Sequence, residues 1–341
     1  NYKMKIIFFD NNLNHEFHSP AAMALLSKKL ENFGDVISGS NKKNKMHRLI
    51  DMIHILVRNR KSLDLVLIDV YSTLSFYYAS ILAGMSIFFS LKYILIIRGG
   101  NMITRLDNSP KLSKLIFNNS RFNIAPSLFI HDQFILNGYN INYIPNFIEL
   151  GRYKFQERRV CRPKILWLRS FHEIYNPDMA IFVLADLIKL FPNAEMCMVG
   201  PDKDGSMERC KKLSDAFNIR SHITFKGLLK KDDWIKLSSN YDIFINTTDY
   251  DNMPISVIEI MALGLPIVST NAGGLKHLHE NGVDALLVDK NDKKSMINNI
   301  AHLLNNESLA YSLSLNGRKK AEKFSWPEIS NSWLSILNSV K

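Results

Sequence analysis

Short runs of apolar residues recur along the chain, separated by longer segments that have the periodicity of helices. The runs are rich in Ile, Leu, Val and Phe, which is typical of strands covered on both faces of a parallel sheet. They lie at residues 5–9, 63–69, 93–97, 164–168, 194–200, 223–227, 242–246, 266–269 and 285–288. The alternation of such strands with helices predicts an α/β protein.

Helix signals stand between several of these runs. Ser19 and Pro20 form an N-cap and first-turn pair, which predicts a helix to about residue 32 with Gly34 at its end. Residues 74–97 carry a single charge, Lys92, and are long enough to suggest a membrane span. Because Ser, Gly and Lys interrupt this stretch, we predict a buried helix followed by the strand at 93–97 instead.

A length of 341 residues with 46% hydrophobic content is sufficient for two domains, each with its own core. The formal net charge is +11, of which residues 1–150 contribute +7 and the remainder +4. An excess of positive charge favours anionic partners, such as a membrane surface, a phosphorylated substrate or nucleic acid. The aromatic residues lie in apolar runs and are not interleaved with basic ones, so we expect no nucleic-acid partner.

Part of the basic charge lies at residues 41–62, around an apolar helical centre. Two interpretations stay open: an ordinary helix with a solvated basic rim, or a helix that lies on an anionic membrane surface. The basic residues are Lys42, Lys43, Lys45, Arg48, Arg58, Arg60 and Lys61. Three cysteines without metal-like spacing, and the absence of an apolar leader at the start of the sequence, indicate a reduced, cytoplasmic setting.

Residues 249–274 hold the densest candidate chemistry. Helical spacing at residues 254–263 begins with Pro254, which suits a first helical turn because its missing N–H costs nothing there. Asp251 precedes this helix and Glu259 lies about two turns beyond Asp251. The free amides at the helix N-terminus are an anion site. Each carboxylate can bind hydroxyl groups, and the helix amides between them can bind phosphate. This arrangement matches a nucleotide-sugar, which has hydroxyl groups on both sides of its phosphates.

The stretch DYDNMPISVIEIMALGLPIVSTNAGG at these residues resembles the donor-binding signature of the retaining glycosyltransferases of family 4. The resemblance implies the GT-B fold, with two Rossmann-like domains facing across a cleft. It places a first domain at residues 1–155, completed by a terminal helix at 325–341 that crosses back to it, and a second domain at 160–324.

The same resemblance assigns roles within the signature. Asp251 contacts the transferred sugar where the family has Glu, and Asn252 replaces the usual Gly, a change that Asn tolerates even at a positive φ. Glu259 binds the ribose. The diphosphate lies on the backbone amides that follow Pro254; this part of the donor site comprises Asn252, Met253, Pro254, Ile255, Ser256 and Val257.

Other donor contacts follow from segments outside the signature. Arg169, just after the strand at 164–168, matches the family arginine that grips the diphosphate, a task that suits its planar fork of donors. Tyr175 stands where the family has Lys. Gly227 and Leu228 match the segment whose backbone reads the nucleobase. By resemblance the catalytic residues are Arg169 and Asp251.

The acceptor side of the cleft is expected in the first domain. Arg98 stands near the point where many family members carry His, and Gly99, Gly100 and Asn101 form a loop after the strand at 93–97. In place of the family's Gly-Gly loop, the first strand is followed by Asn11 and, further on, by Ser19 at a helix start. These residues are the candidate acceptor contacts.

The resemblance implies transfer of a hexosyl or N-acetylhexosaminyl group (EC 2.4) from a UDP- or GDP-sugar. The acceptor would be a hydroxyl of a glycan or a polyprenyl-pyrophosphate-linked acceptor, in bacterial surface polysaccharide or lipopolysaccharide assembly at the inner face of the membrane. No cofactor or metal is expected, despite the D-x-D at Asp249 and Asp251. Two alternatives stay open: a nucleotide-sugar epimerase of the same fold, and a non-catalytic sugar-nucleotide or glycan-binding protein.

Overall fold

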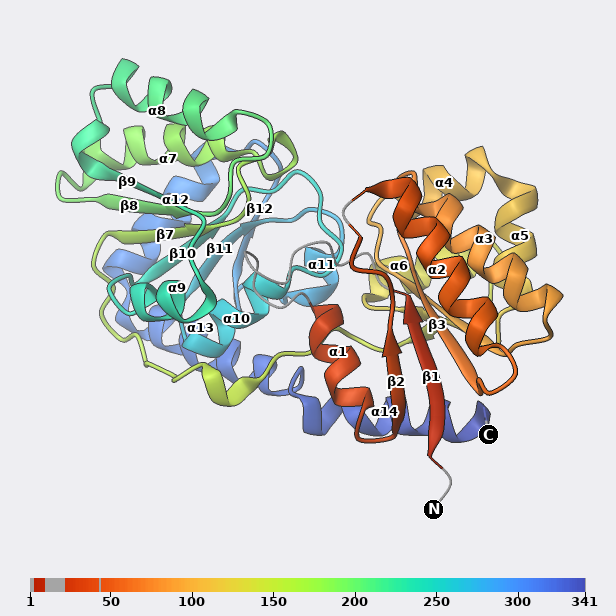
Figure 1. Cartoon of the computed structure of the whole chain (residues 1–341). Helices are drawn as coiled ribbons and strands as arrows, with labels where there is room; N and C mark the ends of the chain where they lie inside the picture. The colour runs from red at the N-terminus through yellow and green to blue at the C-terminus, as the bar shows by residue number, and fades with distance from the viewer. Residues whose placement is uncertain (1–2, 10–21, 43, 341) are drawn as a thin grey trace. The chain divides into compact units, whose positions relative to one another are not determined.

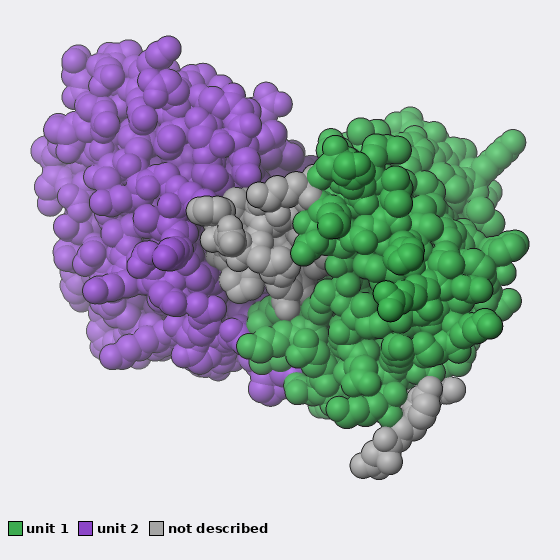
Figure 2. Space-filling view, viewed as in Figure 1, with its two compact units in different colours: residues 1–146, 329–341 green, residues 147–328 purple. Residues whose placement is uncertain are grey.

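A computed structural model describes residues 3–9, 22–42 and 44–340 of the chain. The chain divides into two compact units, one of Asn1–Asn146 with Ile329–Lys341 and the other of Phe147–Glu328 (Figure 2). We call them unit 1 and unit 2. Unit 1 is therefore made from two separate stretches of sequence, and unit 2 lies between them along the chain.

Unit 1 contains a six-stranded parallel sheet in the order β2-β1-β3-β4-β5-β6. Its strands are β1 (Met4–Phe9), β2 (Gly34–Ser38), β3 (Leu65–Val70), β4 (Tyr93–Ile97), β5 (Phe122–Ala125) and β6 (Asn142–Tyr143). Its helices include α1 (Ala22–Leu30), α2 (Lys45–Asn59), α3 (Ser75–Phe88), α4 (Met102–Asn108), α5 (Pro110–Asn118) and α6 (Leu128–Leu136). Helices α2, α3 and α5 lie side by side against this sheet (Figure 1).

The prediction for Gly34 was wrong. This glycine does not end the preceding helix but begins β2, which pairs with β1 in parallel from Met4 opposite Gly34. A Cβ on Gly34 would lie 2.1 Å from the carbonyl oxygen of Met4, so only glycine allows the two strands this approach. Strand β2 was missed because it is an edge strand and only partly buried.

The apolar stretch at residues 74–97 forms α3 and β4, as predicted. All five residues of β4 are buried between its neighbours β3 and β5. Among the described residues, none of the helices combines the length and the apolar character that a bilayer crossing requires. The low charge of this stretch therefore reflects burial of its strand and of one side of its helix.

Unit 2 contains a second six-stranded parallel sheet, in the order β12-β11-β10-β7-β8-β9. Its strands are β7 (Lys164–Leu168), β8 (Glu195–Val199), β9 (Ile223–Gly227), β10 (Ile243–Asn246), β11 (Ile267–Thr270) and β12 (Leu286–Val288). Its α-helices are α7 (Pro177–Leu190), α8 (Ser206–Ala216), α9 (Lys231–Ser238), α10 (Ile255–Leu263), α11 (Leu275–Leu278), α12 (Lys293–Asn305) and α13 (Glu307–Glu322). Short 3-10 helices are η1 (Leu150–Arg152), η2 (Glu173–Tyr175) and η3 (Arg220–His222).

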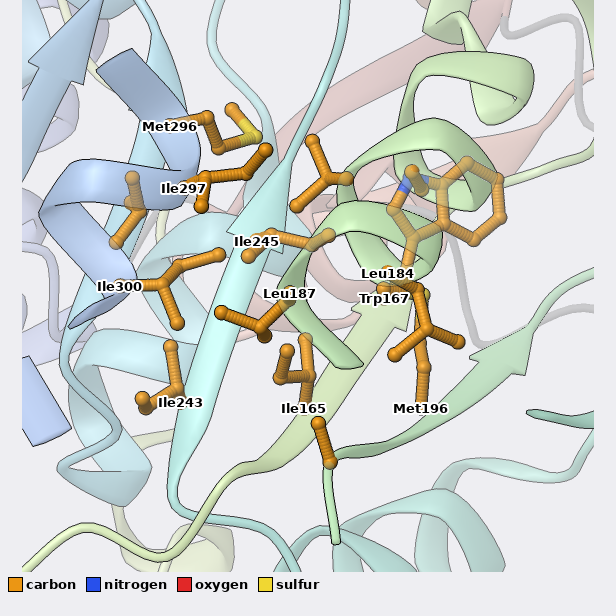
Figure 3. Close-up of a cluster of buried hydrophobic side chains, with 14 of the residues drawn as sticks. Ile165, Trp167, Leu184, Leu187, Met196, Ile243, Ile245, Met296, Ile297 and Ile300 are labelled. Atoms are coloured by element: carbon orange, nitrogen blue, oxygen red, sulfur yellow. The ribbon is translucent and has the colours of Figure 1, made fainter. Parts of the chain in front are cut away.

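Both faces of the unit 2 sheet are apolar, because successive strand residues point to opposite sides. Ile165 and Trp167 of β7 join the cluster under α7 and α12, where Ile300 lies close to the strands (Figure 3). Leu166 and Leu168 of the same strand join a second cluster that includes α10. Because both faces of the sheet are buried, the strands of unit 2 appear in the sequence as continuous apolar runs.

The terminal helix α14 (Trp326–Val340) belongs to unit 1 from Ile329 onward. Lys92 donates from Nζ to the carbonyl oxygen of Val340, and Arg121 Nη2 donates to that of Ser339 at 3.3 Å. Cations at the C-terminal end of a helix satisfy its last carbonyl groups and complement its dipole. The prediction of a terminal helix that returns to the first domain is confirmed.

A buried histidine gives unit 2 a pH-dependent element. His279 Nδ1 lies 2.7 Å from Asp284 Oδ1, and the other oxygen of Asp284 accepts from Lys320 Nζ at 2.7 Å. Burial lowers the pKa of His279 below its ordinary value of 6.5, against the opposing effect of Asp284. In the interval below pH 6.5 the unfolded chain therefore binds a proton at this position that the folded chain does not.

Because the unfolded state takes up more protons in this interval, the free energy of unfolding should fall as the pH drops from about 7 to about 5. We predict that His279→Gln makes this decline shallower, as measured by urea unfolding across the pH range. His302→Gln, at an exposed histidine of α12, is the control and should keep the wild-type slope. Equal slopes in the two variants would contradict the assignment.

Candidate active site

The N-terminus of α10 presents free backbone donors. Pro254 occupies the N-cap position with φ −72° and ψ 110°, one residue before the helical turn in which we predicted it. Its carbonyl oxygen accepts the amide of Val257 at 3.1 Å, whereas the amides of Ile255 and Ser256 donate to no acceptor among the described residues. The available anion site is thus narrower than the predicted one, because the Val257 amide is occupied. Gly264 ends the helix at φ +82°, a left-handed conformation that favours glycine.

A glycine turn supports the residues that precede this helix. A Cβ on Gly273, whose φ is +59°, would lie 2.1 Å from the carbonyl oxygen of Asp251, and one on Gly274 would lie 1.7 Å from that of Asn252. The amide of Gly274 donates to the Asp251 carbonyl at 2.8 Å. Asn252 is not among the described residues with positive φ. The left-handed conformation that Asn could tolerate at this position is therefore not adopted. The left-handed position falls on Gly273 instead, where glycine adopts it without strain.

Arg169 and Asp251 meet at the N-terminus of α10. Arg169 follows β7, and its guanidinium is paired through Nη2 with Asp251 Oδ2. Arg169 Nη1 donates to the Ser256 hydroxyl at 3.0 Å. The second Asp251 oxygen accepts the amide of Asn252 at 2.8 Å. A cation is therefore held beside the two free helix amides, where the helix dipole also favours an anion.

Tyr175 lies against the face of this guanidinium. The Arg169 Cζ atom is 4.1 Å from the centre of the Tyr175 ring, a cation–π contact that fixes the plane of the arginine. Arg169 Nε is buried and has no hydrogen-bond partner among the described residues. Burial lowers the pKa of Arg169, but an arginine remains protonated at neutral pH. Tyr175 thus orients the arginine in the position where the resembled family has Lys.

Glu259 is buried on α10 and has two partners that the sequence analysis missed. Its Oε1 atom accepts the Tyr153 hydroxyl at 2.7 Å and is paired with Lys231 Nζ. Tyr153 follows η1, and Lys231 begins α9. Neither residue belongs to a periodic or motif pattern, so the sequence carried no signal for them.

Gly227 and Leu228 lie at the carboxyl end of β9. Gly227 has φ +62°, and its carbonyl oxygen accepts the amide of Gly200 at 2.8 Å where the register of β8 and β9 shifts. Leu228 is 41% exposed, so it is open to a ligand. Met253, in contrast, is 8% exposed and packs in the α10 core, so it presents little surface to a ligand.

The candidate residues of unit 2 gather at one edge of its sheet. Arg169 follows β7, Leu228 follows β9, and the segment with Asp251 follows β10. Carboxyl ends of parallel strands are where ligands bind in open α/β sheets. No group of three or more His, Cys, Asp or Glu side chains suited to a metal ion occurs within the described ranges.

The acceptor candidates lie in unit 1, and most make local contacts there. Arg98 Nε is 3.0 Å from Asp69 Oδ1, and Arg98 Nη1 donates to the Asn146 side chain at 2.7 Å. A Cβ on Gly99 would lie 2.4 Å from the Ser72 amide nitrogen, and Gly100 follows it in the turn. The Asn101 side chain accepts the Thr104 hydroxyl at 2.7 Å. The other two candidates, Asn11 and Ser19, lie outside the described residues.

Comparison with known protein families indicates which class of enzyme has this kind of fold and site. Residues 153–320 match the family described as glycosyl transferases group 1. The match covers the whole sheet of unit 2 and all the donor candidates from Arg169 to Glu259. Fold and site together support a glycosyltransferase of group 1.

Curated relatives match part of the chain. An uncharacterized glycosyltransferase of Haemophilus influenzae is 28% identical over 161 residues, 47% of this chain and 44% of that protein. A probable sucrose-phosphate synthase of Vicia faba is 29% identical over 134 residues, 38% of this chain and 13% of that protein. The matched region thus spans less than half the length of these two relatives.

Solved structures share the fold along the whole chain. Sucrose-phosphate synthase from Thermosynechococcus elongatus has a TM-score of 0.82 at 16% identity and covers 99% of both chains. HepE from Anabaena, in complex with UDP and glucose, has a TM-score of 0.79 at 17% identity and covers 98% of this chain and 100% of its own. The likeness establishes that the chain has the GT-B fold of two Rossmann-like domains.

The close packing of the turn at Gly273 and Gly274 leads to a prediction about stability. Gly274→Ala would place a methyl group 1.7 Å from the Asn252 carbonyl oxygen, so the backbone would have to move. We predict that this change lowers the free energy of unfolding of unit 2 by about 2 to 4 kcal/mol. Gly84→Ala is the matched control, because a Cβ there meets nothing within 4 Å in helix α3. That change should be neutral or stabilising by up to about 1 kcal/mol. Thermal unfolding that ranks the two variants equally would contradict the close packing of the turn.

Proposed function

We propose that this chain is a retaining glycosyltransferase of family 4 that takes a hexosyl or N-acetylhexosaminyl group from a UDP- or GDP-sugar. The observation that carries the proposal is the Arg169 guanidinium, held beside the free amides of Ile255 and Ser256. A cation and a helix N-terminus at one point form a receptor for a diphosphate. UDP in the HepE structure supports a uridine nucleotide as the first candidate.

The proposed chemistry follows from the charges at this point. As the bond between sugar and diphosphate breaks, negative charge grows on the leaving phosphate oxygen. Arg169 and the two amides stabilise that charge, and Asp251 orients the sugar through its hydroxyls. A leaving phosphate oxygen then accepts the proton of the incoming acceptor hydroxyl on the same face of the sugar. No metal is required in this scheme, because the cation is supplied by the chain.

For the acceptor we propose a hydroxyl of a glycan or of a polyprenyl-pyrophosphate-linked glycan, in bacterial surface polysaccharide assembly. The positive charge of residues 1–150 favours a pyrophosphate-bearing acceptor near unit 1. Two alternatives have distinct outcomes. An epimerase would convert the nucleotide-sugar without change of mass or need of an acceptor, and a non-catalytic binding protein would bind the nucleotide tightly without turnover.

We further propose that unit 1 contacts an anionic membrane surface through α2 and α3, which pack against each other. Large apolar side chains are exposed along one side of α3, at Leu74 (66%), Tyr77 (42%), Ile81 (40%) and Phe88 (81%). Their spacing of three, four and seven residues keeps them within one arc of the helix. We call these four residues the α3 stripe.

Helix α2, which packs against α3, adds positive charge to unit 1. Exposed basic residues lie at both ends of α2, at Lys42, Lys45, Arg58 and Lys61. Arg48, in contrast, is 3% exposed and lies 5.9 Å from the Tyr78 ring, so it is not part of a basic rim, and Lys43 lies outside the described residues. Exposed apolar residues bordered by lysine and arginine are typical of a helix surface that enters the headgroup region of an anionic bilayer.

The donor proposal predicts that UDP or GDP stabilises the protein by about 2.7 kcal/mol at 100 times its dissociation constant, without Mg²⁺. Thermal shift with a panel of nucleotides and their sugars measures this effect. Arg169→Ala and Asp251→Asn should each lower the rate of nucleotide release in a transfer assay by about 10²- to 10³-fold, because each removes a group aimed at the reacting centre.

Arg209→Ala provides the control, since it removes another arginine of unit 2 that is paired with an aspartate, Asp178. This variant should transfer at the wild-type rate. Full activity in Arg169→Ala would refute the assignment. Tight binding with no turnover in the wild type would favour the non-catalytic alternative, and mass-neutral conversion of the donor would favour the epimerase.

The membrane proposal predicts that the protein sediments with vesicles containing anionic lipid and not with neutral ones. Changing Leu74 and Phe88 together to Asp should abolish this binding, because both side chains would bring charge into the headgroup region. Leu136→Asp, at the last residue of α6, which is 79% exposed, is the control and should bind as wild type does. Equal binding by the two variants would eliminate the α3 stripe as the contact surface.

A further inference from the structure

We propose that unit 2 carries a second anion site, a pocket at the C-terminal end of α10 that binds a small organic phosphate. The pocket lies between residues 152–158 and the helices α9 and α10. Leu263, which lines it, is eight residues beyond Ile255, so about 12 Å of helix separate the pocket from the free amides at the other end of α10. The site is therefore distinct from the proposed donor site.

The pocket is basic. It has a volume of about 420 Å³, and none of the described residues that line it is acidic. Its basic lining residues are Arg152, Lys154, Arg158 and Lys236. Arg152 is paired with Asp232 at 2.6 Å, but Lys154 and Lys236 are exposed and form no ion pair within the described part of the chain. Two ammonium groups of the pocket therefore have no counter-charge.

Arg158 adds a buried positive charge to the same pocket. The residue is 3% exposed, and its hydrogen-bond partners are backbone carbonyl groups. Nη1 donates to the oxygens of Gln156 and Leu263 at 2.5 and 2.8 Å, and Nη2 donates to that of Tyr241 at 3.3 Å. Nε is buried and has no partner among the described residues. The carbonyl groups occupy four-fifths or less of its donors and do not neutralise its charge.

The buried charge of Arg158 is not compensated by an ion pair with a described carboxylate. Asp242, whose charge acts on Arg158, is itself bound by Arg162 through Nε at 2.7 Å and Nη2 at 3.1 Å. Burial lowers the pKa of Arg158 to about 10, so the guanidinium keeps its charge at neutral pH. A buried charge without a counter-ion is costly, and an anion in the pocket would reduce that cost. The Arg158 charge also offsets the negative end of the α10 dipole, which would otherwise disfavour an anion.

One wall of the pocket is apolar, and the segment that carries it is fixed to α10. Phe155, Ile235 and Leu263 line the pocket beside the basic residues. A Cβ on Gly264 would lie 2.6 Å from both the Phe155 ring and the Gln156 carbonyl oxygen, so this segment packs tightly on the helix end. The Gln156 amide also donates to the Leu263 carbonyl at 3.2 Å. The pocket is thus formed by contacts within the chain and needs no ligand to shape it.

A phosphate monoester has the chemistry that this pocket fits. Its phosphate carries up to two negative charges, which match the unpaired Lys154 and Lys236, and arginine and lysine are the usual partners of phosphate groups. Its organic part would cover the apolar wall. A mostly apolar cavity with a few convergent polar groups, of the size found here, is typical of sites for small molecules.

Phenyl phosphate is the probe for the test, because it joins a phosphate monoester to an apolar ring. In calorimetric titration the wild type should bind it about 10-fold more tightly than inorganic phosphate, since the ring adds apolar burial. Changing Lys154 and Lys236 together to Met should raise Kd for phenyl phosphate by about 10- to 100-fold, because charged hydrogen-bond donors are lost. The control changes Lys212 and Lys319 to Met, two exposed lysines of unit 2 outside the pocket, and should keep the wild-type Kd.

Arg169→Ala separates this pocket from the proposed donor site. This variant should weaken the binding of UDP or GDP and keep that of phenyl phosphate, whereas the Lys154/Lys236 variant should do the reverse. The inference is overturned if the Lys154/Lys236 variant binds phenyl phosphate as the wild type does, if Arg169→Ala loses phenyl phosphate, or if the wild type does not bind it at millimolar concentration. Failure of the nucleotides alone would overturn the proposed function and leave this site standing.

A vesicle assay distinguishes a soluble phosphate ester from the phosphate of a lipid headgroup. The Lys154/Lys236 variant should sediment with anionic vesicles to the same extent as the wild type. Weaker sedimentation of this variant would assign the pocket to a headgroup and overturn the proposal of a soluble ligand.

Discussion

The backbone of Asp251 and Asn252 lies so close to the turn at Gly273 and Gly274 that a single added methyl group would overlap a carbonyl oxygen. This contact sets the path of the chain into α10. It places Asp251 against Arg169, and it directs the free amides of the helix to the edge of the sheet where strands end. The arginine, the aspartate and the helix dipole act at one point only because two glycines allow the two loops to touch.

The candidate site contains two ion pairs. Arg169 is paired with Asp251 at the start of α10, and Lys231 is paired with Glu259 one turn further along. Each carboxylate has a buried cation beside it, so the ligand-free site carries little net charge of its own. In the proposed function, the attraction for a diphosphate comes instead from the oriented amides and from the donors that Arg169 retains. A site with little net charge but with oriented hydrogen-bond donors selects ligands by the positions of their acceptor atoms more than by their total charge.

The sequence predicted those parts of the fold that are buried on both sides. Strands such as β4 and β7 were found because double burial leaves a run without polar residues, whereas β2 is partly exposed at an edge and has no such run. In the site, the spacing of Asp251 and Glu259 could be read from one short segment. Tyr153 and Lys231 lie 106 and 28 residues from Glu259 and meet it only through tertiary packing. The positions of Pro254 and Asn252 depended on local dihedral angles, which residue type alone does not determine.

The return of α14 to unit 1 affects the order in which the chain acquires structure as it is made. Unit 2 consists of one continuous stretch and has all its residues once Glu328 has been added. Unit 1 still lacks Ile329–Lys341 at that moment, and its Lys92 and Arg121 have no helix end to bind. Domains generally fold as units during synthesis, the earlier one first. Unit 1 is therefore begun before unit 2 and completed after it, when Trp333 and Leu337 of α14 reach their buried positions.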